Sequence, residues 1–290
     1  MEHSGKTRLL GLIGSPVEHS GSPAMYNYCF ETFGLDFCYL AFDIPMEKTA
    51  QAVETIRLLN MRGANVTMPL KAEVTKYLDE LSPAARIIGT VNTIVNENGK
   101  LTGYITDGEG FVKNLQAIGE DVKGRKLTLL GGGGAATAII AQAALDGARE
   151  ISVFNMKDPF FPRIEENLRH IESQVPGCKM ALYDLADQDA LRREIESSDI
   201  LTNATRVGMA PMEEQSLITD LSLLRPGLVV ADTVYHPLET KLLKDAKAAG
   251  CKIAQGLGML IWQGAAAFAL YAPGYEMPVD DVRAKCFPDS

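Results

Sequence analysis

Short apolar runs alternate with amphipathic stretches along the whole chain, and this alternation predicts an α/β protein. In the first 120 residues we predict three buried strands with helices between them, and then a β-hairpin around the turn sequence Asn96-Glu97-Asn98-Gly99. The single strands are residues 8–13, 36–43 and 61–66, the hairpin strands are 91–95 and 100–105, and the helices are 22–33, 47–60, one starting near 70, 82–88 and 109–118. Ser22 and Pro23 are expected as the N-cap and first residue of their helix, with Gly34 closing it.

The second half repeats the pattern more regularly, because strands and helices alternate one by one. Such alternation predicts a parallel, doubly wound sheet. The expected strands are residues 127–130, 150–154, 179–182, 200–203, 228–231 and 252–254, and a long apolar helix over 257–272 ends before Pro273. The polar connector at residues 121–125 marks a domain boundary, so that the second domain covers residues 122–256.

Four glycines, Gly131 to Gly134, follow the first strand of this second domain and open a helix of small residues. Gly131, Gly133 and Ala136 fit the G-x-G-x-x-G/A pattern in the strand–turn–helix context that gives it meaning. The helix N-terminus then offers N–H groups to a pyrophosphate. The other interpretation of such a run is a plain tight turn.

An acidic residue beyond the second strand strengthens the dinucleotide interpretation. Asp158 lies where a carboxylate that binds the ribose hydroxyls is expected. The alternative is that Asp158 caps the helix that follows Pro159.

Composition excludes several other classes of protein. The 290 residues are 46% hydrophobic and carry a net charge of −9 without a basic block, which argues against nucleic acid or an anionic membrane as partner. Five scattered cysteines without a C-x-x-C pair indicate reduced thiols and a cytoplasmic protein. The first residues do not resemble a signal peptide, no stretch is long enough for a membrane span, and the four histidines are not placed for a metal site.

Polar side chains gather just past the strand ends of the first domain, where open α/β sheets bind their ligands. Hydroxyl, amide, ammonium and carboxylate groups are all present, which suits a small polyhydroxylated acid. The pair that we expect to do chemistry is Lys71 and Asp107, since oxidation of a C–H carbon requires a proton to leave the adjoining hydroxyl. The bland alternative is a surface ion pair.

Each of the other candidates also has a structural alternative. Ser20 and Ser22 can hold a carboxylate or cap a helix, and Asn92 can bind a substrate hydroxyl or brace the hairpin. Gln263 on the last helix can face the cleft or make a structural hydrogen bond. We interpret His19 as part of the loop scaffold rather than as a base.

Several segments together resemble the shikimate dehydrogenase family, and more narrowly its quinate/shikimate dehydrogenase branch. They occur in the family's order over nearly the whole chain, which is far more specific than the glycine run alone. The segments are His19-Ser20-Gly21-Ser22-Pro23, Asn65-Val66-Thr67-Met68-Pro69-Leu70-Lys71, Gly89-Thr90-Val91-Asn92-Thr93, Asn203-Ala204-Thr205 with Gly208-Met209, and Gly256-Leu257-Gly258-Met259-Leu260 with Gln263.

The resemblance implies a two-domain α/β fold, in which residues 1–121 and 257–290 form a substrate-binding catalytic domain and residues 122–256 form a Rossmann NAD(P)-binding domain. It implies reversible oxidation of shikimate to 3-dehydroshikimate, a step of aromatic amino acid biosynthesis, with quinate as a further candidate substrate. Lys71 and Asp107 would be catalytic. The substrate residues would be Ser20, Ser22, Thr67, Asn92, Tyr235 and Gln263. The cofactor residues would be Gly132, Gly133, Gly134, Ala135, Asn155, Met156, Lys157, Asp158, Arg206, Thr233, Val234, Tyr235, His236 and Gly256.

Two departures from the family pattern bear on the cofactor. NADP-specific members have Asn-Arg-Thr after the second strand of the dinucleotide domain, whereas this chain has Asn155-Met156-Lys157-Asp158. Met156 cannot pair with a phosphate and Asp158 would repel one, so we expect NAD to be preferred over NADP, with Lys157 leaving room for some NADP use. His236 stands where the family usually has asparagine, which leaves that contact open.

Two other functions stay open on the sequence alone. The chain could hold a dinucleotide and a shikimate-like ligand without turnover, as a sensing module, because a fold does not determine a function. A glycine-rich turn also serves other adenosine ligands, such as S-adenosylmethionine in methyltransferases. The choice between shikimate and quinate is not readable from the sequence, and an apolar strand edge in the first domain is a candidate for pairing in a homodimer.

Overall fold

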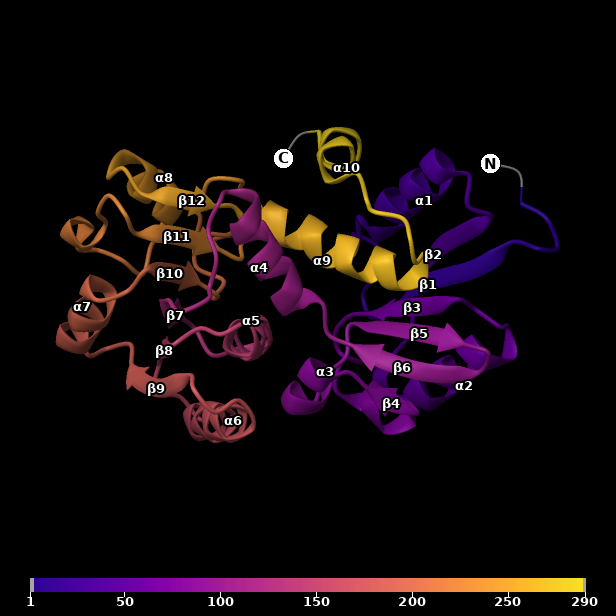
Figure 1. The fold of residues 1–290 in the computed structure, drawn as a ribbon, viewed down its shortest axis with the longest axis horizontal. Helices are drawn as coiled ribbons and strands as arrows, with labels where there is room; N and C mark the ends of the chain where they lie inside the picture. Colours follow the sequence, from indigo (N-terminus) through magenta and orange to yellow (C-terminus); the bar gives the residue numbers. More distant parts are fainter. Residues whose placement is uncertain (1–2, 289–290) are drawn as a thin grey trace. The chain divides into compact units, whose positions relative to one another are not determined.

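Two six-stranded sheets organise residues 3–288, which the computed structural model describes, and each sheet lies in one of two units of the chain (Figure 1). The first unit contains the residues up to Thr106 together with those from Gln263 onward, and the second runs from Asp107 to Trp262. The two-domain α/β fold that the sequence predicts is therefore present.

The sheet of the first unit is mixed. Its strand order is β2-β1-β3-β5-β6-β4, where β1 is parallel to both β2 and β3, and β5 is antiparallel to both β3 and β6. The predicted hairpin is confirmed, and Asn98 and Gly99 form its turn with positive φ angles of 55° and 91°. The strands are β1 (Arg8–Gly14), β2 (Phe37–Asp43), β3 (Gly63–Val66), β4 (Glu80–Leu81), β5 (Thr93–Glu97) and β6 (Lys100–Tyr104).

The helices around this sheet are α1 (Ser22–Phe33), α2 (Thr49–Leu58), α3 (Pro83–Ile88), α10 (Val279–Cys286) and the 3₁₀ turns η1 (Met46–Lys48) and η2 (Glu73–Tyr77). Gly34 closes α1 in the left-handed conformation, as predicted. The expectation of Ser22 as N-cap is wrong by one residue, since Gly21 occupies that position. The helix expected near residue 70 is only the turn η2, and β4 and α10 were not predicted.

An aromatic cluster forms the centre of the first unit. The Tyr26 ring stacks on Tyr39 with centroids 4.6 Å apart and meets the edge of Tyr271 at 6.0 Å. Phe30 of α1 stacks on Phe268 at 5.9 Å. Because Phe268 and Tyr271 belong to the last turns of α9 (Gly256–Tyr271), this cluster holds the end of that helix in the first unit.

The edge strand β2 bears on the predicted homodimer. The Asn27 side-chain amide accepts a hydrogen bond from the Tyr39 N–H at 2.8 Å and donates one to the Tyr39 carbonyl at 2.9 Å. A side chain thus occupies backbone groups that another strand would need at this point of the edge. Pairing of two copies through a strand edge of this sheet stays a prediction.

The sheet of the second unit is parallel throughout, with the strand order β12-β11-β10-β7-β8-β9 (Figure 1). This is the doubly wound order of a Rossmann fold, and it confirms the prediction. The strands are β7 (Lys126–Leu130), β8 (Glu150–Asn155), β9 (Lys179–Asp184), β10 (Ile200–Asn203), β11 (Val229–Asp232) and β12 (Lys252–Ala254). The helices are α4 (Asp107–Ala117), α5 (Gly134–Leu145), α6 (Phe161–Gln174), α7 (Gln188–Glu196), α8 (Lys241–Ala248), the turn η3 (Leu221–Leu223) and the first part of α9.

The units divide at other residues than the sequence suggested. The divisions fall after Thr106 and Trp262, whereas we expected them after residues 121 and 256. The reason is α4, which packs against α5 of the second unit so closely that a Cβ on Gly108 would lie 2.3 Å from the Ala138 carbonyl oxygen. The assignment of substrate to one domain and dinucleotide to the other stays a prediction.

Within residues 3–288, no helix is long and apolar enough to cross a membrane. The longest, α9, has 16 residues.

We expect Gly108→Ala to lower the thermal midpoint of unfolding, because the added methyl meets the Ala138 carbonyl and the Gln142 Cβ at 2.3 and 2.5 Å. Alanine stabilises a helix by about 1 kcal/mol relative to glycine, but overpacking costs about 1–3 kcal/mol. We therefore expect the net effect on stability to be unfavourable. Differential scanning fluorimetry measures the shift. Gly119→Ala is the matched control, since Gly119 has a φ of 77° and open space around it, and its cost is limited to about 1 kcal/mol of backbone strain. A higher midpoint for Gly108→Ala than for the wild type would contradict the close packing of α4 on α5.

Candidate active site

Strand register brings the candidate substrate residues of the first unit to one edge of its sheet. Ile13 pairs with Val66, so parallel strands β1 and β3 end together, and the Thr67 N–H continues the ladder to the Ile13 carbonyl at 2.9 Å. Strand β5 runs the other way and begins at this edge, where Thr93 is paired with Tyr104 at the end of β6. Thr67, Asn92 and Thr106 therefore flank the same edge, as the strand-end argument predicts.

The loops after β1 and β3 are tied to each other at Gly14. A Cβ on Gly14 would lie 2.3 Å from Thr67 Cγ2 and 2.8 Å from the Met68 carbonyl oxygen, so only glycine allows this approach. The Ser15 N–H donates to the same Met68 carbonyl at 3.0 Å. The segment that follows brings Lys71 in, half-buried, with its carbonyl accepting the Val91 N–H at 2.8 Å.

Ser20 and Ser22 stand at the start of α1. The Ser20 hydroxyl accepts the Ser22 N–H at 3.2 Å, and it therefore keeps its own proton to donate. The N-cap of α1 is Gly21, so the alternative of Ser22 as a helix cap is wrong, whereas the Ser20 hydroxyl does bind the first N–H of the helix. A Cβ on Gly21 would lie 3.0 Å from the Phe287 ring, so glycine between the serines leaves room for the residue that follows α10. His19 is exposed in the loop, as expected of a scaffold residue.

Asn92, Thr106 and Gln263 form one hydrogen-bonded group. Asn92 is 3% exposed, its Oδ1 accepts the Thr106 N–H at 2.9 Å, and its Nδ2 donates to Thr106 Oγ1 at 3.0 Å. The same Nδ2 reaches Gln263 Oε1 at 3.4 Å, and the Thr106 hydroxyl reaches it at 3.5 Å. Gln263 thus joins the strand-end group of the first unit, and Asn92 both braces the hairpin and presents an ordered amide.

Lys71 and Asp107 fall on opposite sides of a division between the units. Asp107 directly follows Thr106 in the chain and begins α4 in its first, acidic turn. Their joint action stays a prediction.

The glycine run of the second unit follows β7 at the carboxyl edge of the parallel sheet. Gly131 has a φ of 104°, and a Cβ there would lie 2.7 Å from Thr205 Cγ2, so this glycine is required by the fold. Gly133 and Gly134 are different, because both are exposed and have nothing within 4 Å of an added Cβ. Gly133 also has an ordinary φ of −74° and caps α5 without a side-chain bond. Protein packing does not explain these two glycines, and their place in the binding of a pyrophosphate stays a prediction.

The loop after β8 is joined to this glycine run. Asn155 Oδ1 accepts the Gly132 N–H at 3.1 Å, and its Nδ2 donates to the Met156 carbonyl at 2.8 Å. Asp158 Oδ1 accepts the Phe160 N–H at 2.9 Å in a turn before α6. The N-cap of α6 is Phe160 and no side chain caps it, so the alternative of Asp158 as the helix cap is wrong. Met156 is 66% exposed, and Lys157 and Asp158 are exposed as well. The loop presents a thioether, an ammonium and a carboxylate at its surface.

The loops after β10 and β11 are held by a buried group that the sequence analysis passed over. Asp232 is 2% exposed and accepts from Asn203 Nδ2 at 2.9 Å, the Val234 N–H at 2.9 Å and the Thr240 hydroxyl at 2.7 Å. Burial raises the pKa of Asp232 to about 6, and these hydrogen bonds act against that rise. The available signal was its position at the end of a strand.

Most of the other predicted cofactor residues lie in the loops after β10 and β11, close in sequence to Asn203 and Asp232. Arg206, Tyr235 and His236 are exposed, and Thr233 donates its N–H to the Asn203 carbonyl at 2.9 Å. Gly256 begins α9, where a Cβ would lie 2.3 Å from the Val234 carbonyl oxygen. The loops after three parallel strands thus meet at the edge where the glycine run lies.

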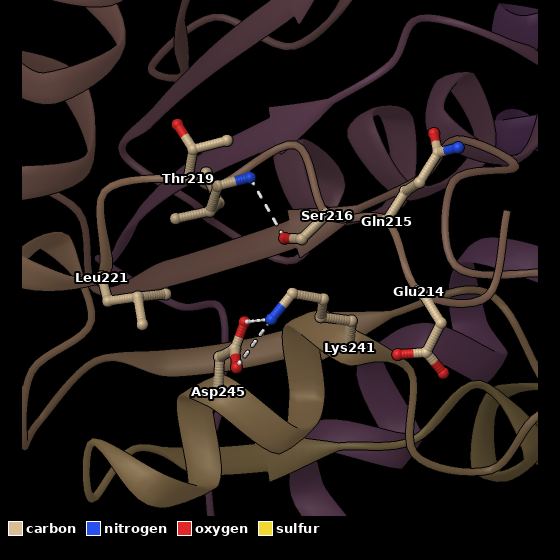
Figure 2. Close-up of a pocket in the computed structure, with 8 residues that line it drawn as sticks. Glu214, Gln215, Ser216, Thr219, Leu221, Lys241 and Asp245 are labelled. Atoms are coloured by element: carbon tan, nitrogen blue, oxygen red, sulfur yellow. Dashed lines mark hydrogen bonds and ion pairs between the residues drawn. The ribbon is translucent and has the colours of Figure 1, made fainter.

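A separate hollow of about 430 Å³ contains none of the predicted site residues (Figure 2). In it Lys241 pairs with Asp245 at 2.9 Å, and Ser216 Oγ accepts the Ile218 N–H at 3.1 Å. Its lining residues are Glu214, Gln215, Ser216, Ile218, Thr219, Leu221, Lys241 and Asp245. Within residues 3–288, no group of three or more His, Cys, Asp or Glu side chains is arranged to hold a metal ion.

Comparisons with known proteins identify the family. The family model of the shikimate dehydrogenase substrate binding domain matches residues 12–94. A relative in Streptococcus uberis, named shikimate dehydrogenase (NADP(+)), is 50% identical over 289 residues, which cover 99% of this chain and 97% of the relative. The chain belongs to the shikimate dehydrogenase family.

Solved structures of the same family extend over the whole chain. Shikimate 5-dehydrogenase from Listeria monocytogenes, in complex with shikimate and NAD, is 48% identical with a TM-score of 0.96, and the match covers 99% of both chains. Quinate dehydrogenase from Corynebacterium glutamicum, in complex with NAD, is 29% identical with a TM-score of 0.87 over 98% of this chain and 99% of that one. As a family member, the protein is an oxidoreductase that acts on a CH–OH group. Family membership therefore favours an enzyme over the sensing module that the sequence alone left open.

The buried Asp232 predicts a pH dependence of stability. Its pKa is 3.8 in an ordinary setting and about 6 when folded, so the folded state holds the proton more tightly. That stabilisation is complete below pH 3.8 and is lost as pH rises through 6, by up to about 3 kcal/mol. We expect the free energy of unfolding of the wild type, measured relative to Asp232→Asn, to fall between pH 4 and 6.5. Urea titrations followed by the fluorescence of Trp262, the chain's one tryptophan, measure it in the second unit. A difference that is constant or rises with pH would contradict the assignment.

Proposed function

We propose that the protein is a shikimate dehydrogenase that prefers NAD, oxidises shikimate reversibly to 3-dehydroshikimate, and acts in aromatic amino acid biosynthesis in the cytoplasm. The observation that carries the proposal is the group of ordered polar side chains at one edge of the first sheet, in a chain 48% identical to a shikimate 5-dehydrogenase that binds shikimate and NAD. We expect substrate at this edge and dinucleotide at the carboxyl edge of the second sheet.

The serines give the substrate carboxylate its place in this proposal. The Ser20 hydroxyl accepts the Ser22 N–H and so keeps its own proton to donate to an anion. The N-terminus of α1 adds a favourable dipole. Thr67, Asn92, Gln263 and Tyr235 would bind the ring hydroxyls, since they supply both donors and acceptors.

Lys71 and Asp107 would handle the proton of the hydroxyl that is oxidised. Oxidation leaves a carbonyl only if this proton departs, and a lysine amine within hydrogen-bond reach can take it up and return it in the reverse direction. Asp107 would hold the same hydroxyl and orient it toward Lys71. The carbonyl of Lys71 is fixed by Val91, which limits the movement of its backbone.

The glycine run and the loop after β8 fit a nicotinamide dinucleotide. Gly133, Gly134 and Ala135 are exposed at the start of α5, where their N–H groups would bind the pyrophosphate, and Asn155 holds Gly132 behind them. The remaining contacts would come from Arg206, Thr233, Val234, Tyr235, His236 and Gly256. When bound, the nicotinamide ring accepts the hydride from the substrate carbon or returns it.

The preference for NAD rests on three exposed residues after β8. Met156 offers no donor for a 2′-phosphate, whereas Asp158 can accept a ribose hydroxyl and repels a phosphate. Lys157 would compensate in part and permit some NADP use. The Streptococcus uberis relative is named for NADP, whereas the Listeria monocytogenes structure contains NAD. Family membership alone therefore does not decide between NAD and NADP.

We include quinate as a second substrate to be tested. Quinate carries one more ring hydroxyl than shikimate, and the Corynebacterium glutamicum relative is a quinate dehydrogenase. Both acids present the same carboxylate to Ser20 and Ser22.

We expect Lys71→Ala to lower kcat by about 10²–10⁴-fold, the range that general acid–base catalysis contributes. The measurement is shikimate-dependent reduction of the dinucleotide, followed by absorbance. Lys76→Ala is the matched control, because Lys76 lies on the same segment but pairs with Glu73 at 2.7 Å on the surface. Turnover of Lys71→Ala near the wild-type rate would remove Lys71 from the catalytic step.

Four assays that cross shikimate or quinate with NAD or NADP test the substrate and cofactor together. We expect turnover of shikimate, with a higher kcat/KM for NAD than for NADP. The variant Asp158→Asn keeps an oxygen for the Phe160 N–H but removes the charge, so it should move the NADP-to-NAD ratio of kcat/KM upward. Repulsion of about 1–2 kcal/mol corresponds to roughly 5–30-fold.

Two results would overturn parts of the proposal. A wild-type preference for NADP would refute the proposed preference for NAD but would leave the proposed dehydrogenase activity intact. Absence of turnover in all four assays, with folded protein, would refute the activity itself.

A further inference from the structure

A chain of buried hydrogen bonds lies beneath the candidate substrate residues of the first unit. Tyr39 on β2 donates its phenol proton to Asn65 Oδ1 at 2.8 Å, and Asn65 Nδ2 donates to Thr93 Oγ1 at 3.1 Å. The Thr93 hydroxyl then donates to Asn92 Oδ1 at 3.0 Å. Tyr39 and Thr93 are each 0% exposed and Asn65 is 6% exposed, so water does not compete for these bonds.

Two backbone groups determine the direction of every bond in this chain. The Asn92 carbonyl can only accept, and it takes a hydrogen bond from Asn65 Nδ2 at 3.3 Å, so the Asn65 nitrogen must face Thr93. The Thr106 N–H can only donate, and it binds Asn92 Oδ1 at 2.9 Å. The Thr93 hydroxyl accepts at one side and must give its proton to the other. As a result the Asn92 Nδ2 is turned toward Thr106 and Gln263.

The far end of the chain is the buried phenol of Tyr39. Its ring stacks on Tyr26 at 4.6 Å, and the Asn27 side chain binds its backbone N–H and carbonyl. This ordered phenol and the amide that would bind a ring hydroxyl are connected by side chains that all belong to the first unit.

We propose that Tyr39, Asn65 and Thr93 are positioning residues for substrate, which orient the Asn92 amide. They touch no substrate themselves. The proposal rests on the proposed function, in that Asn92 is taken to bind a ring hydroxyl. Asn92 Nδ2 donates to Thr106 Oγ1 at 3.0 Å and to Gln263 Oε1 at 3.4 Å. The bond to Gln263 is the longer of the two, and it is the one that a substrate oxygen would replace.

Thr93→Val tests the proposal, because it keeps the shape of the side chain and removes the hydroxyl. We expect the KM for shikimate to rise about 3–10-fold, the value of one hydrogen bond of about 1 kcal/mol, with the KM for NAD within twofold of the wild type. Thr93→Ser should restore the wild-type KM, since it returns the hydroxyl. If Thr93→Val does not fold, Tyr39→Phe is the second variant. We expect it to raise the KM for shikimate at least about twofold, which is less than the rise expected for Thr93→Val.

The matched control is Thr49→Val. Thr49 is 2% exposed in the same unit, and its hydroxyl donates to the Met46 carbonyl at 2.6 Å, away from the chain of bonds. Thr49→Val should lower the thermal midpoint as Thr93→Val does and leave the KM for shikimate unchanged. Equal effects of the two variants on that KM would show that only stability is lost, and would overturn the proposal.

A double-mutant cycle separates this proposal from the proposed function. If Thr93 acts through Asn92, Thr93→Val has no further effect on the KM for shikimate in an Asn92→Ala background. An unchanged KM in Asn92→Ala alone would refute the role of Asn92, and with it the proposed site. A raised KM in Asn92→Ala together with a wild-type KM in Thr93→Val would refute the positioning role and leave the proposed function intact.

Discussion

Strand register is the constraint on which both candidate binding regions depend. In the first unit, β1 and β3 end together because Ile13 pairs with Val66, and the hairpin strands meet the same edge because Thr93 pairs with Tyr104. A shift of one residue in any of these ladders would turn the side chains to the opposite face of the sheet. In the second unit, parallel pairing alone gathers the loops after β7, β8, β10 and β11 at one edge. The chemistry of the side chains is therefore useful only because the backbone ladders fix where each strand stops.

Glycines in this protein have separable causes, and the separation helps to locate ligands. Gly14, Gly108 and Gly131 have protein atoms where a Cβ would be, so the fold itself requires them. Gly133 and Gly134 have open space at that position and lie at the start of α5. A glycine that the fold does not need is explained when something outside the chain must come close to the backbone. This reasoning gives the glycine run more weight than its match to a sequence pattern.

Much of the fold could be predicted from the chain, because apolar runs of strand length alternated with helical stretches and the turn at Asn98-Gly99 has a strong local signal. The strand β4, with two residues, and the short helix α10 have no such periodic signal, and their formation depends on tertiary packing. The candidate residues at strand ends could also be found. The importance of Asp232 and Thr93 lies in which donors and acceptors surround them, and only the folded structure reveals those partners.

The two units solve the same physical problem with different chemistry. Each buries polar side chains at the edge where loops must be held still, and a buried polar group must be satisfied by partners. The first unit uses the amides of Asn65 and Asn92 with Thr93, which carry no charge and can be buried at low cost. The second uses the carboxylate of Asp232, which accepts from Asn203, Thr240 and a backbone N–H, and whose raised pKa records the cost of burying charge. A neutral chain of hydrogen bonds keeps its arrangement over a wide range of pH. Asp232 instead stabilises the loops of the second unit most in acid and less as pH rises through about 6. The order of the two edges therefore responds differently to the same change in pH.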